Sequence, residues 1–379
     1  MFPRKIMLVF KKILFWIVPL FVAMMFSLAL PQRAEAVVRT WDGGGVGDTN
    51  WGTCANWSDD TCPTSSDIAT FDGTSTNNVT IAATLTGSTA PAGIDINTGY
   101  IGTITQSADV SITVGASNYD QADGVFTGGN SAITINGAFT LSSGIFTSTS
   151  GTLTVSGDWT HTAGGTFTHS SGTVKITGTD KTIDVNATEA FSNLTFNVDS
   201  TSVRTVANSD TLNVANTLTV TEGSLNQTTV PAAGTVVVQV SISHPTTFNG
   251  GTAQVNLEGS GTVNFSSGQM TGFKLNSASA VATGHTSGTL NFDGAVTIAA
   301  GTFNAGDGAI TVGSGLLFTV SGGTFNGGAG TVTMNGGVTI SGGAFNGGTL
   351  TDFFCNSCTF TLSGGTLAPG SGTLKVGGN

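Results

Sequence analysis

The sequence predicts an all-β fold, a parallel β-helix with about 20–22 residues in each coil. One observation is a nearly fixed spacing of aromatic residues, since Phe303, Phe325 and Phe345 lie 22 and 20 residues apart. A constant period of this length indicates a repeat architecture. A second observation is the short alternating run inside each repeat, such as "TLTV" and "AITV". Alternation of β-branched and polar residues favours strands.

The composition agrees with an ordered chain that contains many tight turns. Charged residues make up 9% of the 379 residues, glycine contributes 55, and the hydrophobic fraction is 39%. Disordered chains combine low hydrophobicity with high charge, so this balance argues against disorder. Pairs of Asn and Gly follow several runs and suit two-residue hairpins, so an antiparallel meander is a competing interpretation. The fixed period favours the solenoid.

Residues 1–36 are expected to be a secretory signal peptide. Four basic residues precede an apolar run at residues 13–30, and Ala34 and Ala36 form the small-residue pattern of a cleavage site. The run is long for a signal core, so an uncleaved membrane anchor is the alternative. Without residues 1–36 the chain keeps 6 basic and 21 acidic residues, a formal charge of −15. This charge argues against nucleic-acid partners and against membrane contact beyond the segment itself.

Residues 37–99 form a dense block that we expect to cap the first coil. Trp41, Trp51 and Trp57 would plug the open end of the solenoid, with Cys54 and Cys62 bridged in an exported chain. The alternative is a carbohydrate site in which the three tryptophan rings stack on sugars.

Calcium is a possible ligand of the same block. Asp48, Asp59 and Asp60 are the candidate ligands, because carboxylate oxygens suit this cation. No other cofactor is expected.

Residues 100–379 are expected to form about 13 coils, a rod of roughly 60 Å at the usual spacing between strands. Stacking would place Phe303, Phe325 and Phe345 in one interior ladder. The residues that follow them, Asn304, Asn326 and Asn346, would form a ladder of hydrogen-bonded amides. The chain ends within a repeat and without a polar cap, which predicts either a fragment or an end covered by another subunit.

A second cysteine pair, Cys355 and Cys358, lies in this repeat region and is also expected to form a disulfide. A zinc site built from all four cysteines is the alternative, but the two pairs lie far apart in the sequence.

The sequence offers little for catalysis, so we expect no enzyme. Ionisable groups are sparse, and the nearest approach to a catalytic cluster consists of Asp180, Lys181, Asp184, His161 and His169. A glycosidase needs two carboxylates at a defined distance, and Asp158 and Asp180 are 22 residues apart and could stack on neighbouring coils. A polysaccharide lyase or glycoside hydrolase is therefore a minor alternative. Rows of threonine such as Thr152 and Thr154 suggest an ice-binding face. The equivalent positions in other repeats are not regularly threonine, which argues against this function.

The opening "WDGGG…NWGT…ANWS…PT…DIATF" and the later copies of "GGTFNGG" resemble bacterial secreted surface proteins with autotransporter-associated β-strand repeats. The resemblance extends over residues 38–379 and implies a right-handed parallel β-helix, exported and exposed at the cell surface. The expected function is that of a non-catalytic, adhesin-like stalk or repetitive binding surface, with glycans, other surface proteins or further copies of the chain as partners. A polysaccharide-binding or polysaccharide-degrading β-helix is the alternative.

Overall fold

The computed structural model describes residues 36–197, 199–207, 209–227, 235–243, 245–246, 248–350, 352–355 and 358–377. The chain divides into two compact units, Met1–Ala36 and Val37–Asn379. The expected signal peptide lies outside the described residues, apart from Ala36, and stays a prediction. Within the described ranges, no helix is long and apolar enough to cross a membrane.

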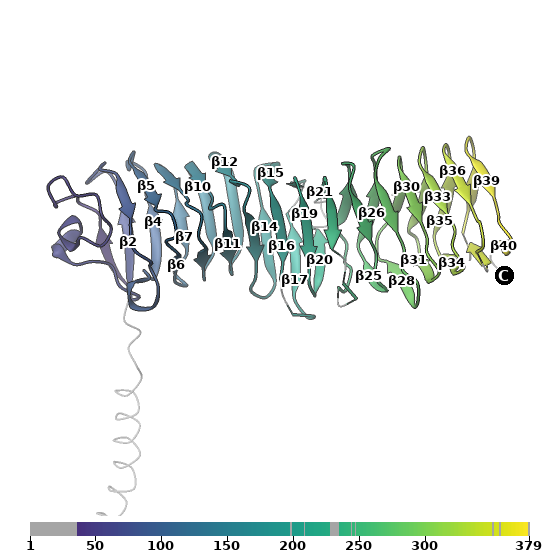
Figure 1. Ribbon diagram of the computed structural model, residues 1–379, viewed down its shortest axis with the longest axis horizontal. Helices are drawn as coiled ribbons and strands as arrows, with labels where there is room; N and C mark the ends of the chain where they lie inside the picture. The colour runs from purple at the N-terminus through teal and green to yellow at the C-terminus, as the bar shows by residue number, and fades with distance from the viewer. Residues whose placement is uncertain are drawn as a thin grey trace, which may run out of the picture. The chain divides into compact units, whose positions relative to one another are not determined.

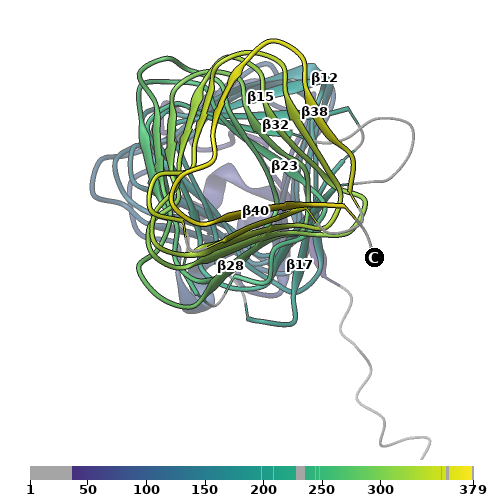
Figure 2. The ribbon, with the colours of Figure 1, turned by 90° about the vertical axis from the view of Figure 1, so that its right-hand side faces the viewer.

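The second unit is a right-handed parallel β-helix, as the sequence predicts. Its coils stack along one axis from the aromatic block to the C-terminal strands (Figure 1). Seen from the C-terminal end, each coil has three faces, and the chain runs along them counterclockwise as it approaches the viewer (Figure 2). Every pairing between the named strands is parallel, which excludes the antiparallel meander for the described region.

Along the chain, the first face is formed by the twelve-stranded sheet as far as β20 and by the six-stranded sheet from β25 onward. Its strands are β1 (Val37–Thr40), β2 (Asp67–Phe71), β4 (Gly93–Ile96), β7 (Tyr119–Gln121), β10 (Phe139–Thr147), β12 (Trp159–Thr168), β14 (Lys181–Asp184), β17 (Val203–Val206), β20 (Ser224–Gln227), β25 (Gly268–Met270), β28 (Thr289–Phe292), β31 (Ala309–Val312), β34 (Thr331–Met334), β37 (Asp352–Cys355) and β40 (Thr373–Val376).

The second face carries the later halves of the bent strands β10 and β12 and the nine-stranded sheet. Its other strands are β3 (Val79–Ile81), β5 (Thr103–Gln106), β8 (Val125–Thr127), β15 (Thr188–Phe191), β18 (Thr211–Val214), β21 (Thr235–Val238), β23 (Gln254–Leu257), β26 (Gly272–Leu275), β29 (Val296–Ile298), β32 (Leu317–Val320), β35 (Gly337–Ile340) and β38 (Phe360–Leu362).

The third face is one uninterrupted sheet of 13 strands. They are β6 (Ile112–Val114), β9 (Ile133–Ile135), β11 (Thr152–Val155), β13 (Thr173–Ile176), β16 (Asn193–Phe196), β19 (Thr217–Val220), β22 (Ser241–Ser243), β24 (Thr262–Asn264), β27 (Val281–Thr283), β30 (Thr302–Asn304), β33 (Thr324–Asn326), β36 (Ala344–Asn346) and β39 (Thr366–Ala368).

Side-chain alternation places apolar residues inside the coils and polar residues outside. The predicted phenylalanine ladder is confirmed, because Phe325 stacks on Phe303 at 5.7 Å and on Phe345 at 4.7 Å between ring centroids. Identical residues meet because parallel strands in register place each side chain over its equivalent in the previous coil.

The asparagine ladder is also confirmed. Asn326 donates its amide to Asn304, and Asn346 donates to Asn326, both at 3.0 Å.

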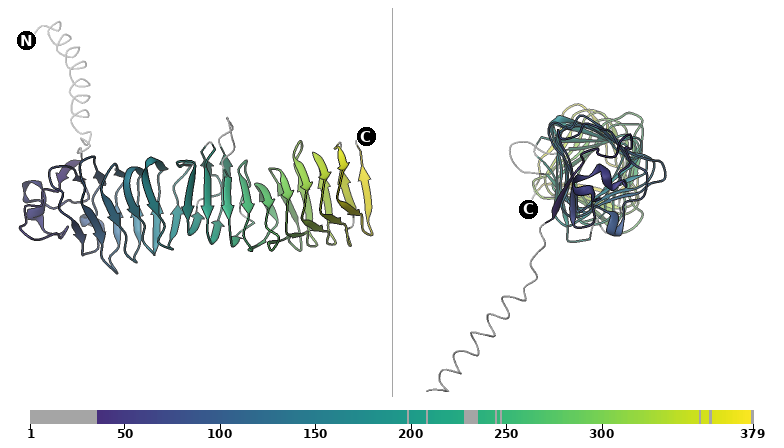
Figure 3. Two further views of the ribbon diagram at one scale, coloured as in Figure 1. Left: turned by 90° about the horizontal axis from the view of Figure 1, so that it is seen from above. Right: turned by 90° about the vertical axis from the view of Figure 1, so that its left-hand side faces the viewer.

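Three short 3-10 helices complete the described elements. They are η1 (Cys54–Asn56), η2 (Ser58–Asp60) and η3 (Gly87–Thr89). The first two belong to the N-terminal block, and the end of the rod that this block occupies faces the viewer in the right-hand view of Figure 3. The block therefore forms the end of the solenoid unit.

Candidate functional site

The three tryptophans of the N-terminal block lie inside it. Trp41 and Trp57 are fully buried, and Trp51 is 3% exposed. The ring of Trp57 packs edge-on against Trp41 at 5.2 Å and against Trp51 at 4.8 Å, and all three surround Phe71. Exposed ring faces are needed for stacking on sugars, so the proposed carbohydrate site at these three residues is wrong. The rings instead extend the interior of the first coil, as a plug does.

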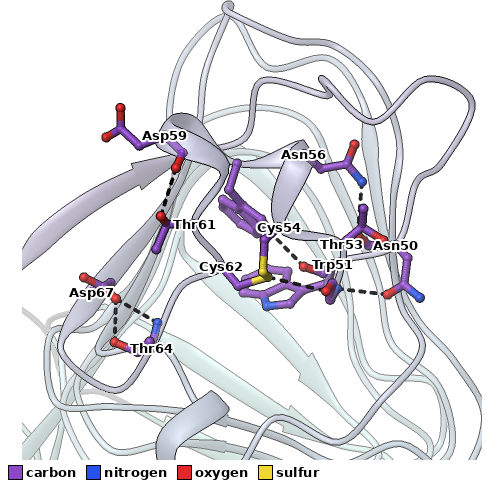
Figure 4. The surroundings of a disulfide bond; sticks show 12 residues. Asn50, Trp51, Thr53, Cys54, Asn56, Asp59, Thr61, Cys62, Thr64 and Asp67 are labelled. Carbon is purple, nitrogen blue, oxygen red and sulfur yellow. Dashed lines mark hydrogen bonds between the residues drawn. A yellow bond between two sulfur atoms is a disulfide. The ribbon is translucent and has the colours of Figure 1, made fainter.

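The backbone of the block is held by a disulfide and by one buried amide. Cys54 and Cys62 are bridged, with 4.5 Å between their Cα atoms, which confirms the predicted pairing (Figure 4). Asn56 is fully buried and accepts from the Gly45 N–H at 2.8 Å while its amide donates to the Asn50 carbonyl at 3.2 Å. Sequence reasoning missed Asn56, since nothing distinguishes it from the many exposed asparagines of the chain.

The carboxylates proposed for calcium do not converge. The Asp48 carboxylate accepts from the Asn50 N–H at 2.8 Å and from the Thr53 hydroxyl, and these bonds lower the pKa of Asp48, the hydroxyl having the larger effect. Asp59 lies 3.5 Å from the Arg39 guanidinium, and Asp60 is exposed. Among the described residues, no group of three or more His, Cys, Asp or Glu side chains could hold a metal ion. The predicted calcium site at Asp48, Asp59 and Asp60 is therefore not assembled.

A small cavity of about 170 Å³ lies where the block meets the first coil. Its walls come from Trp51, Cys62, Pro63 and Leu85, with the hydroxyl-bearing Thr84 and Thr89 beside them. The cavity is mainly apolar and has no charged residue in its lining. It marks the seam between the plug and the β-helix.

The second cysteine pair is also a disulfide. Cys355, the last residue of β37, is joined to Cys358, with 5.3 Å between their Cα atoms. Cys355 is fully buried in the interior. With all four thiols in disulfides, no thiolate remains for the alternative zinc site.

The residues that came nearest to a catalytic cluster are separated by the fold. Asp158 and Asp180 lie at turns, where each carboxylate accepts a backbone N–H of the next coil, from Thr182 and Val203, both at 2.9 Å. His169 accepts from the Ser171 N–H on an exposed turn. These three side chains cap turns of the backbone, and His161 points into the interior.

Within the interior, His161 meets a residue that sequence reasoning did not single out. Its Nδ1 lies 2.6 Å from a carboxylate oxygen of Glu189, and the two residues are only 8% and 4% exposed. The hydrogen bond to Glu189 raises the pKa of His161, while burial opposes the shift. The pair is 28 residues apart, more than one coil, so no repeat spacing indicates it.

One further cation lies inside the rod. The Arg204 guanidinium is buried and donates to the carbonyls of Val203 at 3.0 Å, Thr177 at 2.7 Å and Gly178. Burial lowers the pKa of Arg204, and the nearby charge of Asp180 acts in the opposite sense. Carbonyl oxygens rather than carboxylates thus solvate this charge.

The outer surface of the third face carries almost no charge. None of its 13 strands contains Asp or Glu, and Lys175 is the one charged residue in them. Thr, Ser and Asn dominate its outward positions, in register from one strand to the next. The face is consequently a long plane of hydroxyl and amide groups, nearly free of charge.

No protein-family model, curated protein or solved structure matches the chain. Its function is therefore argued from its own residues.

Proposed function

We propose that the chain is an exported, non-catalytic surface protein that acts as a stiff stalk. The observation that carries the proposal is the unbroken third face, whose 13 parallel strands run nearly the length of the described solenoid. A continuous hydrogen-bonded sheet resists bending and extension, because every coil is bonded to the coils before and after it.

Two further features support this function. The aromatic plug protects one end of the sheet from adding other strands. The two disulfides suit an oxidising compartment such as the cell exterior.

The test is localisation combined with a length change. A stalk should be cleaved from intact source cells by an external protease, and a variant lacking residues 301–342, two coils by the repeat spacing, should bring an N-terminal epitope measurably closer to the opposite end. Confinement to the cytoplasm, or hydrolysis of a polysaccharide by the purified protein, would contradict the proposal.

A second candidate is a repetitive binding surface for uncharged glycans, and the third face, which is unbroken and carries only Lys175 as a charge, favours it. Weak contacts repeated along a rigid plane add up when one polymer engages many rungs. Glycan-array binding of the purified protein tests this candidate, with calcium and with a chelator. Thr154→Glu together with Thr219→Glu places charge on the third face and should abolish binding, while Thr311→Glu on the first face is the matched control. Equal binding by all variants would dismiss the third face as the site.

A further inference from the structure

The second face contains one interruption in its hydrogen-bonded ladder. The later half of β12, Thr166–Thr168, pairs with β10 on one side, and the described residues of β15 pair with β18 alone. β12 and β15 are nevertheless close in space. The rod thus has a break on one face near the middle of the chain, while the third face continues across it through β13 and β16.

The His161–Glu189 pair lies across this break. His161 belongs to β12 and Glu189 to β15, and their side chains meet at 2.6 Å inside the coil. The position of Glu189 in the next coil is occupied by Leu212, and then by Val236, so a carboxylate replaces an aliphatic side chain in this ladder. Trp159 and Phe191 also touch across the break, with 5.6 Å between ring centroids. Phe167, in the later half of β12, also packs against Phe191 at 5.8 Å. One polar bond and two aromatic contacts therefore take the place of the missing strand pairing.

The charged groups around the pair are few. β10 and β18 have none, β12 has only His161, and β15 has only Glu189. β14 carries Lys181, which is half-buried on the same side of the strand as the inward-facing Ile183, and Asp184, which is exposed on the opposite side. Asp210, just before β18, uses its carboxylate on the Val185 N–H at 2.7 Å. Glu189 is thus the one carboxylate bonded to His161, and His161 is the one cation bonded to Glu189, within the described chain.

The second ring nitrogen of His161, Nε2, is buried against Gly165, where an added Cβ would lie 3.0 Å from that nitrogen. Nε2 makes no hydrogen bond of regular geometry, but the backbone of Gly165 adds to the effect of Glu189 and raises the pKa of the ring. When the ring is protonated, its charge neutralises the buried carboxylate. When the ring loses that proton, Nδ1–H still donates but Glu189 is left as a buried charge without a counter-charge, which is strongly unfavourable.

We propose that His161 and Glu189 form a pH-sensitive clasp that closes the break between β12 and β15, giving the rod one joint that opens as the surroundings become alkaline. The sign follows from linkage. A histidine whose charged form is stabilised by folding has a higher pKa in the folded state than its unfolded pKa of about 6.5. Its contribution to stability is fully present below the unfolded pKa and is lost as pH rises through the folded pKa. The joint is therefore closed in mildly acidic surroundings and loosened in alkaline ones.

Hydrogen–deuterium exchange of the purified protein, corrected for intrinsic rates, tests the clasp between about pH 5.5 and pH 9. Peptides covering β12 and β15 should lose protection by about tenfold relative to β33 and β36 over this range, because one charge-assisted hydrogen bond is weakened. Glu189→Gln and His161→Gln should each abolish the pH dependence. His285→Gln changes another buried histidine, far from the break, and should leave the pH dependence of exchange in β12 and β15 unaltered.

A variant with both polar groups removed keeps the test decisive if the single variants unfold. His161→Leu combined with Glu189→Leu restores aliphatic side chains like those of neighbouring coils, and it should be folded, protected and insensitive to pH across the break. The proposal fails if β12 and β15 follow the reference strands at every pH in the unmodified protein. It also fails if the double variant keeps the original pH profile.

Discussion

Replacing Trp57 by alanine should release the N-terminal plug while leaving the rest of the rod folded. Trp57 is fully buried and contacts Trp41, Trp51 and Phe71, with ring centroids 4.8–5.5 Å away. Its Nε1 also donates to the Trp51 carbonyl at 2.8 Å. Removing a buried tryptophan destabilises a core by about 3–5 kcal/mol, and the lost hydrogen bond adds about 1 kcal/mol.

This loss should remain local, because each coil contacts only its neighbours. Hydrogen exchange measures it directly: amides of β2 and β4 should lose about 5 kcal/mol of protection, the middle of the summed range, while those of β33 and β36 keep theirs. Trp57→Phe is the matched control, since it keeps a ring in the plug and should lose about 1–2 kcal/mol. Unchanged protection of β2 in Trp57→Ala, or equal loss along the whole rod, would refute the description of this block as a local cap.

Four smaller perturbations test other parts of the structure. Cys54→Ser with Cys62→Ser should lower the stability of the cap by about 2–3 kcal/mol by releasing a short loop, measured as a lower exchange protection of β2. Asn326→Ala removes two amide bonds of the ladder and should destabilise β30 and β36 by about 1–2 kcal/mol in the same assay. Gly343→Ala should destabilise the later coils by about 1–3 kcal/mol in thermal unfolding, because φ is 69° and the new Cβ would lie 2.1 Å from a carbonyl of the previous coil. Burial raises the pKa of Asp210, so its ionisation weakens the fold; the stability gained by Asp210→Asn should grow between about pH 3 and pH 7, and a gain that is constant with pH would contradict this account.

The repeat spacing was sufficient to predict the fold and the interior ladders. Parallel strands in register convert a period in sequence into a column in space, so Phe303, Phe325 and Phe345 had to meet once the fold was a solenoid. The asparagines beside them followed for the same reason.

The same spacing could not assign strands to faces. Thr152 and Thr154 of β11 show the same alternation as Thr331 and Thr333 of β34, yet β11 lies on the third face and β34 on the first. Each coil holds short strands of similar composition on all three faces, so a shift by one face leaves the alternating pattern unchanged. Variable turn lengths misled the comparison of Asp158 with Asp180 as well, since Asp158 lies opposite Thr182.

The candidate sites were predicted less well than the fold, because they depend on burial. Alternation indicates which residues point inward within a strand, but the aromatic block at residues 37–99 has few strands and its tryptophans could have faced either way. The disulfides required only that nearby cysteines meet. The His161–Glu189 pair required two different strands to bend towards one corner, and no pattern in the sequence encodes that meeting.

Most of the buried ionisable side chains nevertheless share a location along the rod. His161, Glu189, Arg204 and Asp210 lie within 50 residues of one another, whereas the described chain buries only Asp67 and His285 besides them among acidic, basic and histidine residues. Each occupies or borders a coil in which the second face changes from the bent strands β10 and β12 to the nine-stranded sheet. Burying such groups is unfavourable unless they are bonded, so these coils gain less from their interior than coils filled by phenylalanine and valine. In a stalk of stacked coils, force and thermal opening act first on the weakest interface between neighbours. The weakest interface of this rod is therefore expected at its middle, between β12 and β15, and the protonation of one histidine sets how weak it is.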